Sequence, residues 1–366
     1  MRYLEELRDP ALAGALVARI RARMTRPWSI MEVCGGQTHT LARYGLEALL
    51  PEGLSIVHGP GCPVCVTPAA MVDRAIALAC TPGVVLHTYG DMLRVPASQG
   101  DLLAARSRGG EVRVVLSPLE AVDAARLEPA RRHVFFAVGF ETTAPATAVA
   151  IELADALGLA SFSVLAAHVR VPPVLELLFS DPRTRVDGLL AAGHVCTVMG
   201  VSEYEPIAAR HRVPLVVTGF EPVDLLEGIA RTIEQLERGE HRVEIQYSRA
   251  VKPEGSPGAR ATMERVFEPT ERPFRGLGAV RAGGLALRER VARFDAGRRL
   301  LLEVFSEEPD PRCRAGEVLR GLLRPLDCPE LGRGCTPEHP LGAPMVSGEG
   351  ACAAYHRHRA RREPGR

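Results

Sequence analysis

The stretch "HVFFAVGFETTAP", residues 133–145, decides the fold class, because an apolar run leads through a Gly-Phe-Glu loop into a helical pattern. A second stretch, "VPLVVTGFEPVD" at residues 213–224, repeats the apolar run and the Gly-Phe-Glu loop. Apolar, β-branched runs that alternate with helical patterns are typical of parallel sheets covered by helices. The two stretches therefore predict an α/β protein with two similar halves.

Further apolar runs of this kind extend the pattern in both directions. They are "SIMEV" (29–33), "LSIVH" (54–58), "GVVLHTY" (83–89), "VRVVLS" (112–117), "FSVLAAH" (162–168), "VDGLLAA" (186–192) and "VEIQYS" (243–248). The pattern then stops, and a helical pattern over 285–305 is followed by sequence rich in Gly, Pro and Cys. We therefore predict two Rossmann-like parallel-sheet domains, residues 1–128 and 129–255, and a small helical, loop-rich third domain without a sheet, residues 256–366.

The composition excludes several classes of protein. The chain has 366 residues, of which 46% are hydrophobic, and a formal net charge of +1, as in a soluble globular protein with no basic surface for nucleic acid. The charge-free stretch 53–72 contains three prolines, so we expect no membrane span. The first 24 residues lack the apolar core of a signal peptide, which predicts a cytoplasmic protein. Lys252 is the only lysine, so there is no GK[ST] phosphate loop.

Two cysteines stand three positions apart in "HGPGCPVCVTP", residues 58–68. The cytosol keeps ordinary thiols reduced, so Cys62 and Cys65 are not expected to be a routine structural disulfide. A CxxC pair before a helix in an α/β context is typical of a redox-active dithiol. Metal ligation and a purely structural pair stay open as alternatives.

Cys34 lies in "EVCGGQTHT", residues 32–40, where it closes a predicted strand. Two glycines follow, and a helix is expected from about Thr38 or His39. Thiol pKa values fall near helix N-termini, so we predict that Cys34 is biased toward the thiolate, the form that binds soft metals. His39 would supply an imidazole from the first turn. The alternative is that Cys34 is a small core residue and His39 an ordinary polar one.

The C-terminal part contains four more cysteines within 40 residues: Cys313, Cys328, Cys335 and Cys352. Four thiolates in loop-rich sequence suit either zinc or a cubane iron–sulfur cluster, since both take four sulfur ligands. The CxxC pairs of zinc ribbons and the CxxCxxC run of ferredoxins are both absent, which favours iron–sulfur only slightly. Scattered buried thiols are the third possibility, and Cys80 and Cys196 are predicted to be core residues.

Five motifs in order along the chain resemble one family, the hydrogenase maturation factors called HypD. The motifs are "EVCGGQTHT", "HGPGCPVCVTP", "TYGDMLRVP", "GFETTAPATA" and "DCPELGRGCTPEHPLGAPMVSGEGACAAY". They span residues 32–355, so the resemblance covers nearly the whole chain. One departure is Pro344, where some relatives have cysteine, and four tail cysteines remain without it.

The resemblance implies a scaffold protein on which the Fe(CN)2CO centre of nickel–iron hydrogenases is assembled. It implies a HypC-type chaperone as partner and a HypE-type protein that donates cyanide, together with its HypF-type partner. Cys34 would be the iron-binding thiol, with His39 close by, and Cys62 and Cys65 the redox-active dithiol. The implied ligands of a [4Fe-4S] cluster are Cys313, Cys328, Cys335 and Cys352.

Polar residues near these motifs are candidates for orienting the iron fragment: His58, Asp91, Glu141, Thr142 and Thr143. Glu141 is expected to face the cleft between the two halves; for each residue the alternative is a helix cap or loop salt bridge. Electrons would pass from the cluster through the dithiol to the iron. Because the product leaves on a partner protein, no isolated turnover reaction is required. The alternatives are an iron–sulfur thiol-disulfide reductase without iron at Cys34 and a zinc-stapled interaction module.

Overall fold

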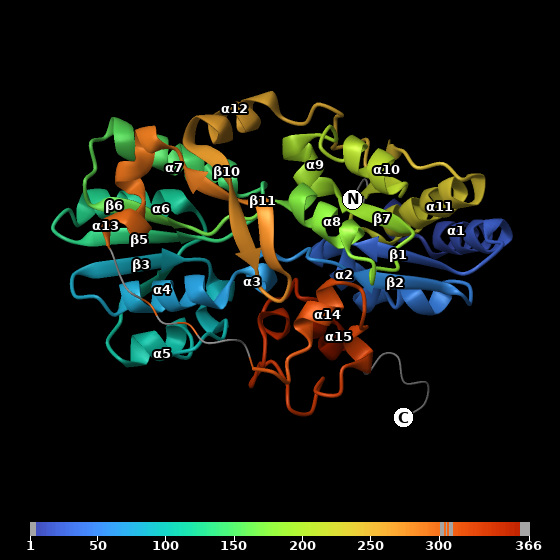
Figure 1. Cartoon of the computed structure of the whole chain (residues 1–366), viewed down its shortest axis with the longest axis horizontal. Helices are drawn as coiled ribbons and strands as arrows, with labels where there is room; N and C mark the ends of the chain where they lie inside the picture. Colours follow the sequence, from blue (N-terminus) through green and yellow to red (C-terminus); the bar gives the residue numbers. More distant parts are fainter. Residues whose placement is uncertain (1–4, 301–303, 305, 307–309, 359–366) are drawn as a thin grey trace.

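Two parallel β-sheets form the body of the protein in the computed structural model, which describes residues 5–300, 304, 306 and 310–358 (Figure 1). One sheet has five strands in the order β2-β1-β7-β8-β9, and the other has four in the order β4-β3-β5-β6. Every pairing within these two sheets is parallel, which confirms the predicted α/β class.

The strands coincide with the predicted apolar runs. Their bounds are β1 (Trp28–Glu32), β2 (Leu54–His58), β3 (Val84–Thr88), β4 (Val112–Val114), β5 (Arg132–Ala137), β6 (Phe162–Ala166), β7 (Gly188–Ala192), β8 (Leu215–Thr218) and β9 (Val243–Ile245). All five residues of β3 and all five of β7 are buried. Strands covered on both faces read as continuous apolar runs rather than alternating ones, which is why the sequence shows them.

Helices connect and cover the strands. Their bounds are α1 (Pro10–Arg23), α2 (Gly35–Tyr44), α3 (Pro63–Val66), α4 (Ala69–Ala79), α5 (Leu102–Ser107), α6 (Pro118–Leu127), α7 (Ala144–Ala156), α8 (Val171–Ser180), α9 (Gly193–Met199), α10 (Glu205–His211), α11 (Pro222–Arg238), α12 (Pro257–Val266), α13 (Ala296–Arg299), α14 (Ala315–Leu319) and α15 (Ala351–His358). Local sequence sets several starts: Ser117 and Glu120 form a capping box at α6, which satisfies free backbone N–H groups. No helix in the described ranges is long and apolar enough to cross a bilayer.

The two sheets do not follow the order of the sequence. The chain begins the five-stranded sheet with β1 and β2, builds all of the four-stranded sheet with β3 to β6, and returns to the first sheet at β7. The predicted boundary at residue 128 therefore does not separate the sheets, because β3 and β4 lie before it and pair with β5 and β6. The order of the strands along the chain does not reveal which strands pair with each other in a sheet.

A two-stranded antiparallel hairpin, β10 (Phe267–Phe274) and β11 (Gly278–Leu287), lies in the third part of the chain, where we expected no sheet. Pro269 and Pro273 obscure the strand pattern, and an edge strand tolerates them because its outward N–H groups need no partner. The helix predicted over 285–305 is also wrong: strand β11 covers its start, a 3-10 helix (Glu289–Phe294) and α13 follow, and 301–303 and 305 lie outside the described residues.

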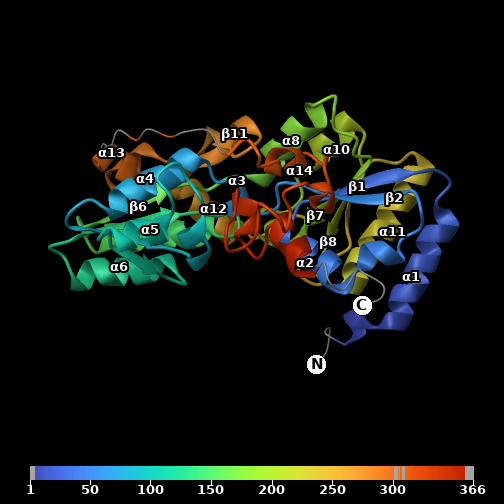
Figure 2. The same cartoon turned by 90° about the horizontal axis from the view of Figure 1, so that it is seen from below.

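The C-terminal residues form a small lobe beside the junction of the two sheets, where the hairpin tip and α3 also lie (Figures 1 and 2). It consists of α14, α15, two 3-10 helices (Pro325–Asp327 and Ala343–Met345) and connecting loops. The remaining 3-10 helices are Glu6–Arg8, Leu46–Leu49 and Gly90–Arg94. The helical and loop-rich character predicted for this lobe is confirmed.

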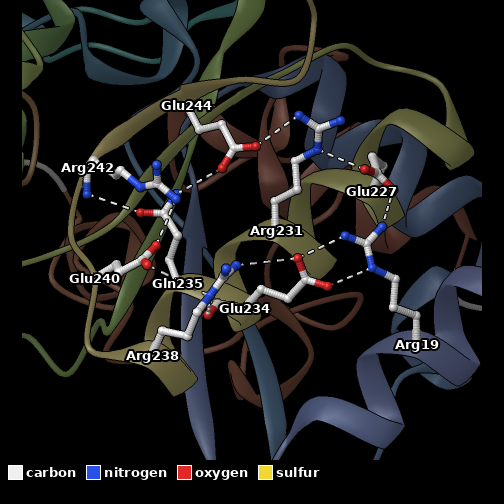
Figure 3. Close-up of polar contacts among 9 residues, drawn as sticks. All are labelled: Arg19, Glu227, Arg231, Glu234, Gln235, Arg238, Glu240, Arg242 and Glu244. Atoms are coloured by element: carbon white, nitrogen blue, oxygen red, sulfur yellow. Dashed lines mark hydrogen bonds and ion pairs between the residues drawn. The ribbon is translucent and has the colours of Figure 1, made fainter.

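A network of ion pairs joins α1 to α11, which packs against β7 and β8 of the five-stranded sheet (Figure 3). The Arg19 guanidinium lies 2.7 Å from Glu234 and 2.9 Å from Glu227. Arg231 continues the network, 2.8 Å from Glu227 and 2.9 Å from Glu244 of β9. Each pair is partly exposed, so its contribution comes mainly from being part of a network.

We expect Arg19→Ala to lower the free energy of unfolding by about 1 kcal/mol at low salt, and by less at high salt, because salt screens partly exposed ion pairs. Urea unfolding at two salt concentrations measures both quantities. Arg21→Ala, an exposed position on the same helix, is the control and should change stability by less than about 0.5 kcal/mol. An equal loss in both variants would contradict a role for the network.

Candidate functional site

Cys34 lies where β1 ends and α2 begins, at the carboxyl edge of the five-stranded sheet. The loop after β2 crosses directly over it: a Cβ on Gly61 would lie 2.2 Å from the Cys34 backbone N. The Gly35 N–H donates to the Gly61 carbonyl at 3.1 Å. Gly35 in turn packs so closely on Glu349 that a Cβ would lie 2.3 Å from the Glu349 Cβ. Three separate segments of chain therefore meet around this cysteine.

The surroundings of the Cys34 thiol favour its protonated form and not the predicted thiolate. Burial raises its pKa to about 12, with a smaller contribution from the Glu32 charge, and both outweigh the backbone N–H groups of Gln37 and Gly36 at the helix start. The prediction of a thiolate bias is thus wrong for the chain without metal, because desolvation exceeds the helix N-terminal effect.

His194, in the first turn of α9, supplies the imidazole next to Cys34. Its Nδ1 lies 3.6 Å from the Cys34 Sγ. Burial lowers the pKa of His194 to about 4, so the ring is neutral, which is the form that ligates metals. Sequence reasoning missed His194. The available signal was its position just after β7, which is the neighbour of β1 in the same sheet.

His39 does not occupy the position expected for it. Its half-buried ring packs edge-on against His358 of α15, with 5.3 Å between the centroids. A residue five positions along a helix is rotated by about 140° from the first, which points the His39 ring away from Cys34. The Cys34–imidazole pair is therefore formed across two strands of the sheet and not within α2.

A buried hydrogen-bond network holds the backbone of Cys34 in place. The Cys34 N–H donates to Glu32 Oε2 at 2.9 Å, and His58 Nδ1 lies 2.6 Å from Glu32 Oε1. His58 Nε2 lies 2.9 Å from the Tyr355 hydroxyl, which donates to Glu47. Burial alone lowers the pKa of His58, but its hydrogen bonds to the two glutamates outweigh this and raise it to about 9. His58 and Glu32 thus form a buried ion pair, which holds the Glu32 side chain in place.

Cys62 and Cys65 form a disulfide across the single turn of α3, with 5.2 Å between their Cα atoms. Both residues are buried, and Cys62 directly follows Gly61, so the pair is adjacent to the Cys34 backbone. Cys65 lines a cavity of about 300 Å³ whose other walls include Cys313 and Arg275. The pair is therefore placed between Cys34 and the C-terminal lobe.

A cleft of about 440 Å³ opens between the ends of the two sheets. Its lining includes Pro63, Val64, Asp91, Thr142, Thr143, His194 and Glu349. Asp91 is held by a hydrogen bond from the Ser347 hydroxyl at 2.9 Å. The structure thus brings three of the predicted polar residues, Asp91, Thr142 and Thr143, into the same cavity as His194. His58 does not line it.

Glu141 does not line the cleft either, contrary to the expectation. Its fully buried carboxylate turns away and accepts the Val171 N–H, at the start of α8, at 3.0 Å. Burial raises the pKa of Glu141 to about 7. Its other oxygen has no hydrogen-bond partner among the residues that the structure describes. Glu141 is therefore a buried hydrogen-bond acceptor for the start of α8, and it lies behind the residues that line the cleft.

The four tail cysteines line one small cavity in the C-terminal lobe, with apolar walls that include Val318, Leu331 and Met345. Cys335 Sγ accepts the Leu341 N–H at 3.4 Å. Burial and the neighbouring thiols raise the pKa of Cys352. Within 5–300 and 310–358, no three His, Cys, Asp or Glu side chains are grouped to hold a single ion. Four sulfurs, apolar walls and an N–H to sulfur fit the donor set of an iron–sulfur cluster.

Comparison with known proteins gives a consistent result. The sequence model described as "HypD: Hydrogenase formation hypA family" matches residues 11–359. The chain is 46% identical to the hydrogenase expression/formation protein HupD of Azotobacter chroococcum mcd 1, covering 99% of this chain and 98% of that one. It is 46% identical to the hydrogenase maturation factor HypD of Azotobacter vinelandii, with 99% and 98% covered. Identity to HypD of Escherichia coli (strain K12) is 41%, with 98% of each covered. The chain therefore belongs to the HypD family of hydrogenase maturation factors.

Proposed function

We propose that this chain is the cytoplasmic scaffold on which the Fe(CN)2CO fragment of nickel–iron hydrogenases is assembled, with the iron as its substrate. The observation that carries the proposal is the pair of Cys34 Sγ and His194 Nδ1, 3.6 Å apart, with His194 lining the 440 Å³ cleft. Thiolate and imidazole are ligands that suit iron. Cys34 and His194 would hold the iron from adjacent strands, and the cleft would contain its diatomic ligands.

The chain's own groups define how the iron would be bound. A metal must displace the proton of Cys34, whose pKa of about 12 makes the free thiol neutral, so binding releases a proton. Glu32 fixes the Cys34 backbone through its hydrogen bond at 2.9 Å. In the cleft, the hydroxyl of Thr142 is a donor that would suit a cyanide nitrogen atom, which is a hydrogen-bond acceptor, whereas the Thr143 hydroxyl already donates to the Phe140 carbonyl at 3.3 Å.

A cluster at the tail cysteines would supply electrons, and the Cys62–Cys65 pair would pass them on. A [4Fe-4S] cluster held by Cys313, Cys328, Cys335 and Cys352 supplies single electrons when it is bound. The Cys62–Cys65 disulfide takes up two electrons and one proton to give a thiol and a thiolate. Cys65 faces a cavity shared with Cys313, while Pro63 and Val64 of the same turn line the cleft. Helix α3 therefore links the lobe to the cleft.

The open cleft would receive the partners that the family relationship suggests. We propose that a HypC-type chaperone binds over it and shares the iron. A HypE-type protein, working with its HypF-type partner, would deliver cyanide there. These proposals rest on the relationship to the HypD family and on the position of the cleft.

The test is anaerobic purification of the full chain, alone and with a HypC-type partner, followed by iron and zinc analysis and by visible and infrared spectroscopy. We expect visible cluster absorption and infrared bands of cyanide and carbon monoxide. The bands should vanish in Cys34→Ala while the absorption stays. Cys80→Ala is the matched control and should keep both, because Cys80, which we predicted to be a core residue, is exposed at the end of α4. Bands that persist in Cys34→Ala would refute the proposal.

A second pair of variants tests the imidazole. Changing a residue that merely orients a metal ligand typically lowers affinity by 10- to 100-fold, so we expect His194→Ala to weaken iron retention at least about tenfold. His39→Ala should retain iron, because its ring packs on His358. Iron released to a chelator over time measures the difference. If His39→Ala lost iron faster than His194→Ala, His39 would be the ligand instead.

An iron–sulfur thiol-disulfide reductase is the second candidate, favoured by the cavity that Cys65 shares with Cys313. Iron content after selective removal of the cluster separates the two functions. A scaffold retains an iron that depends on Cys34, whereas a reductase retains none and still reduces a partner disulfide through Cys62 and Cys65. A colourless protein with one zinc would instead identify the lobe as a structural module.

A further inference from the structure

Arg275 lies in the turn between β10 and β11, at the tip of the hairpin. This tip lies beside α3, the turn between Cys62 and Cys65 (Figure 1). The backbone N–H of Arg275 donates to the Val66 carbonyl at the end of α3 at 2.8 Å. Its guanidinium Nη2 donates to the Pro96 carbonyl at 2.5 Å. The hairpin tip is thus attached directly to the turn that contains Cys62 and Cys65.

The C-terminal lobe holds the other side of the tip. Arg320 donates to the Leu277 carbonyl at 3.0 Å and also to the Gly276 carbonyl. Gly276 has φ +76° and packs so closely that a Cβ would lie 2.8 Å from the Gly316 Cα of α14. The tip is therefore clamped between α3 and the cysteine-rich lobe, and the position of Arg275 is fixed from both sides.

The positive charge of Arg275 is balanced only at a distance, by the Asp73 carboxylate and the Cys313 thiol. No ion pair involves it among the described residues, and its buried Nη1 has no hydrogen-bond partner there. An arginine stays protonated in proteins. The side chain lines the 300 Å³ cavity together with Cys65 and Cys313, so a cation that makes no direct ion pair with the described residues borders the space beside the disulfide. Such a charge interacts strongly in a partly desolvated site.

We propose that Arg275 is a positioning residue that stabilises the Cys65 thiolate and thereby raises the reduction potential of the Cys62–Cys65 disulfide. This inference rests on the dithiol role in the proposed function. When two electrons and one proton enter, the S–S bond breaks to give one thiol and one thiolate. Cys62 Sγ already has a donor in the Cys65 N–H at 3.2 Å, whereas Cys65 lines the same cavity as Arg275. Arg275 would supply the opposite charge that Cys65 needs.

The experiment equilibrates the full chain, with and without its cluster, in dithiothreitol or glutathione redox buffers. Alkylation and mass spectrometry then give the reduced fraction of the Cys62–Cys65 peptide. We expect Arg275→Gln to lower the equilibrium constant for reduction about tenfold, which is about 30 mV for a two-electron couple. Arg275→Lys keeps the charge and should restore most of the potential. Arg298→Gln is the control, because Arg298 is exposed, lines none of these cavities and is paired with Glu289 at 2.7 Å.

Two results would overturn the inference. One is an unchanged potential in a folded Arg275→Gln protein. The other is an equal fall in Arg275→Lys, which would mean that the hairpin tip matters and its charge does not. A different result would show that the proposed function is wrong: the wild-type protein would lack the cyanide and carbonyl bands. That result would not affect the measurement of the reduction potential.

Discussion

Gly61→Ala is expected to lower the free energy of unfolding by about 3 kcal/mol and to abolish iron binding at Cys34. A Cβ at this position would lie 2.2 Å from the Cys34 N, 2.4 Å from the Val33 carbonyl carbon and 2.6 Å from the Cys34 Cα. These are backbone atoms, which cannot rotate aside as a side chain does, so the overpacking cost falls at the upper end of its usual range. The loop must move, and Cys34 moves with it relative to His194.

Urea unfolding measures the loss of stability, and the cyanide and carbonyl bands measure the loss of iron. The four tail cysteines line a cavity of their own whose walls include neither Gly61 nor Cys34, so cluster absorption should persist in the folded variant. Gly14→Ala in α1 is the control: its Cβ meets nothing within 4 Å, and alanine should stabilise the helix by about 0.5–1 kcal/mol. A Gly61→Ala protein as stable as wild type would show that the two loops do not approach this closely.

The sequence predicted the strands well because local burial determines them. Strands covered on both faces, such as β3 and β7, must be continuous apolar runs, and such runs are visible without knowing their neighbours. The pairing of strands could not be read in the same way. The return of the chain to the five-stranded sheet at β7 depends on contacts between segments more than 100 residues apart in sequence, Ile30 with Gly188 for example.

The same distinction applies to the site. The thiols at positions 34, 62 and 65 could be found from motifs, because cysteine spacing and nearby glycines are local features. His194 could not, since only the pairing of β1 with β7 brings it to Cys34. The prediction that Cys34 is a thiolate was wrong for a related reason. The start of α2 lowers the pKa of Cys34 and is visible in the local sequence, whereas the burial that raises this pKa comes from distant segments such as the one around Glu349.

The second large effect is a fall in stability between pH 6.5 and 9 that depends on His58. The folded-state pKa of His58 is about 9, above its ordinary value of 6.5. A raised pKa means that the folded chain holds this proton more tightly than the unfolded chain. The stabilisation is therefore fully present below pH 6.5 and is lost as the pH rises through 9. At 1.36 kcal/mol for each unit of pKa shift, the loss is about 3 kcal/mol.

Urea unfolding of wild type and His58→Gln across this range isolates the contribution, because other titrating groups cancel in the difference. His241→Gln is the control and should keep the wild-type slope. A parallel pH dependence in wild type and His58→Gln would mean that the buried Glu32–His58 ion pair is absent. If the pair is present, its loss also frees Glu32, which accepts the Cys34 N–H at 2.9 Å. Iron retention should then fall together with stability, because one buried carboxylate holds both the histidine and the backbone of the iron-binding cysteine.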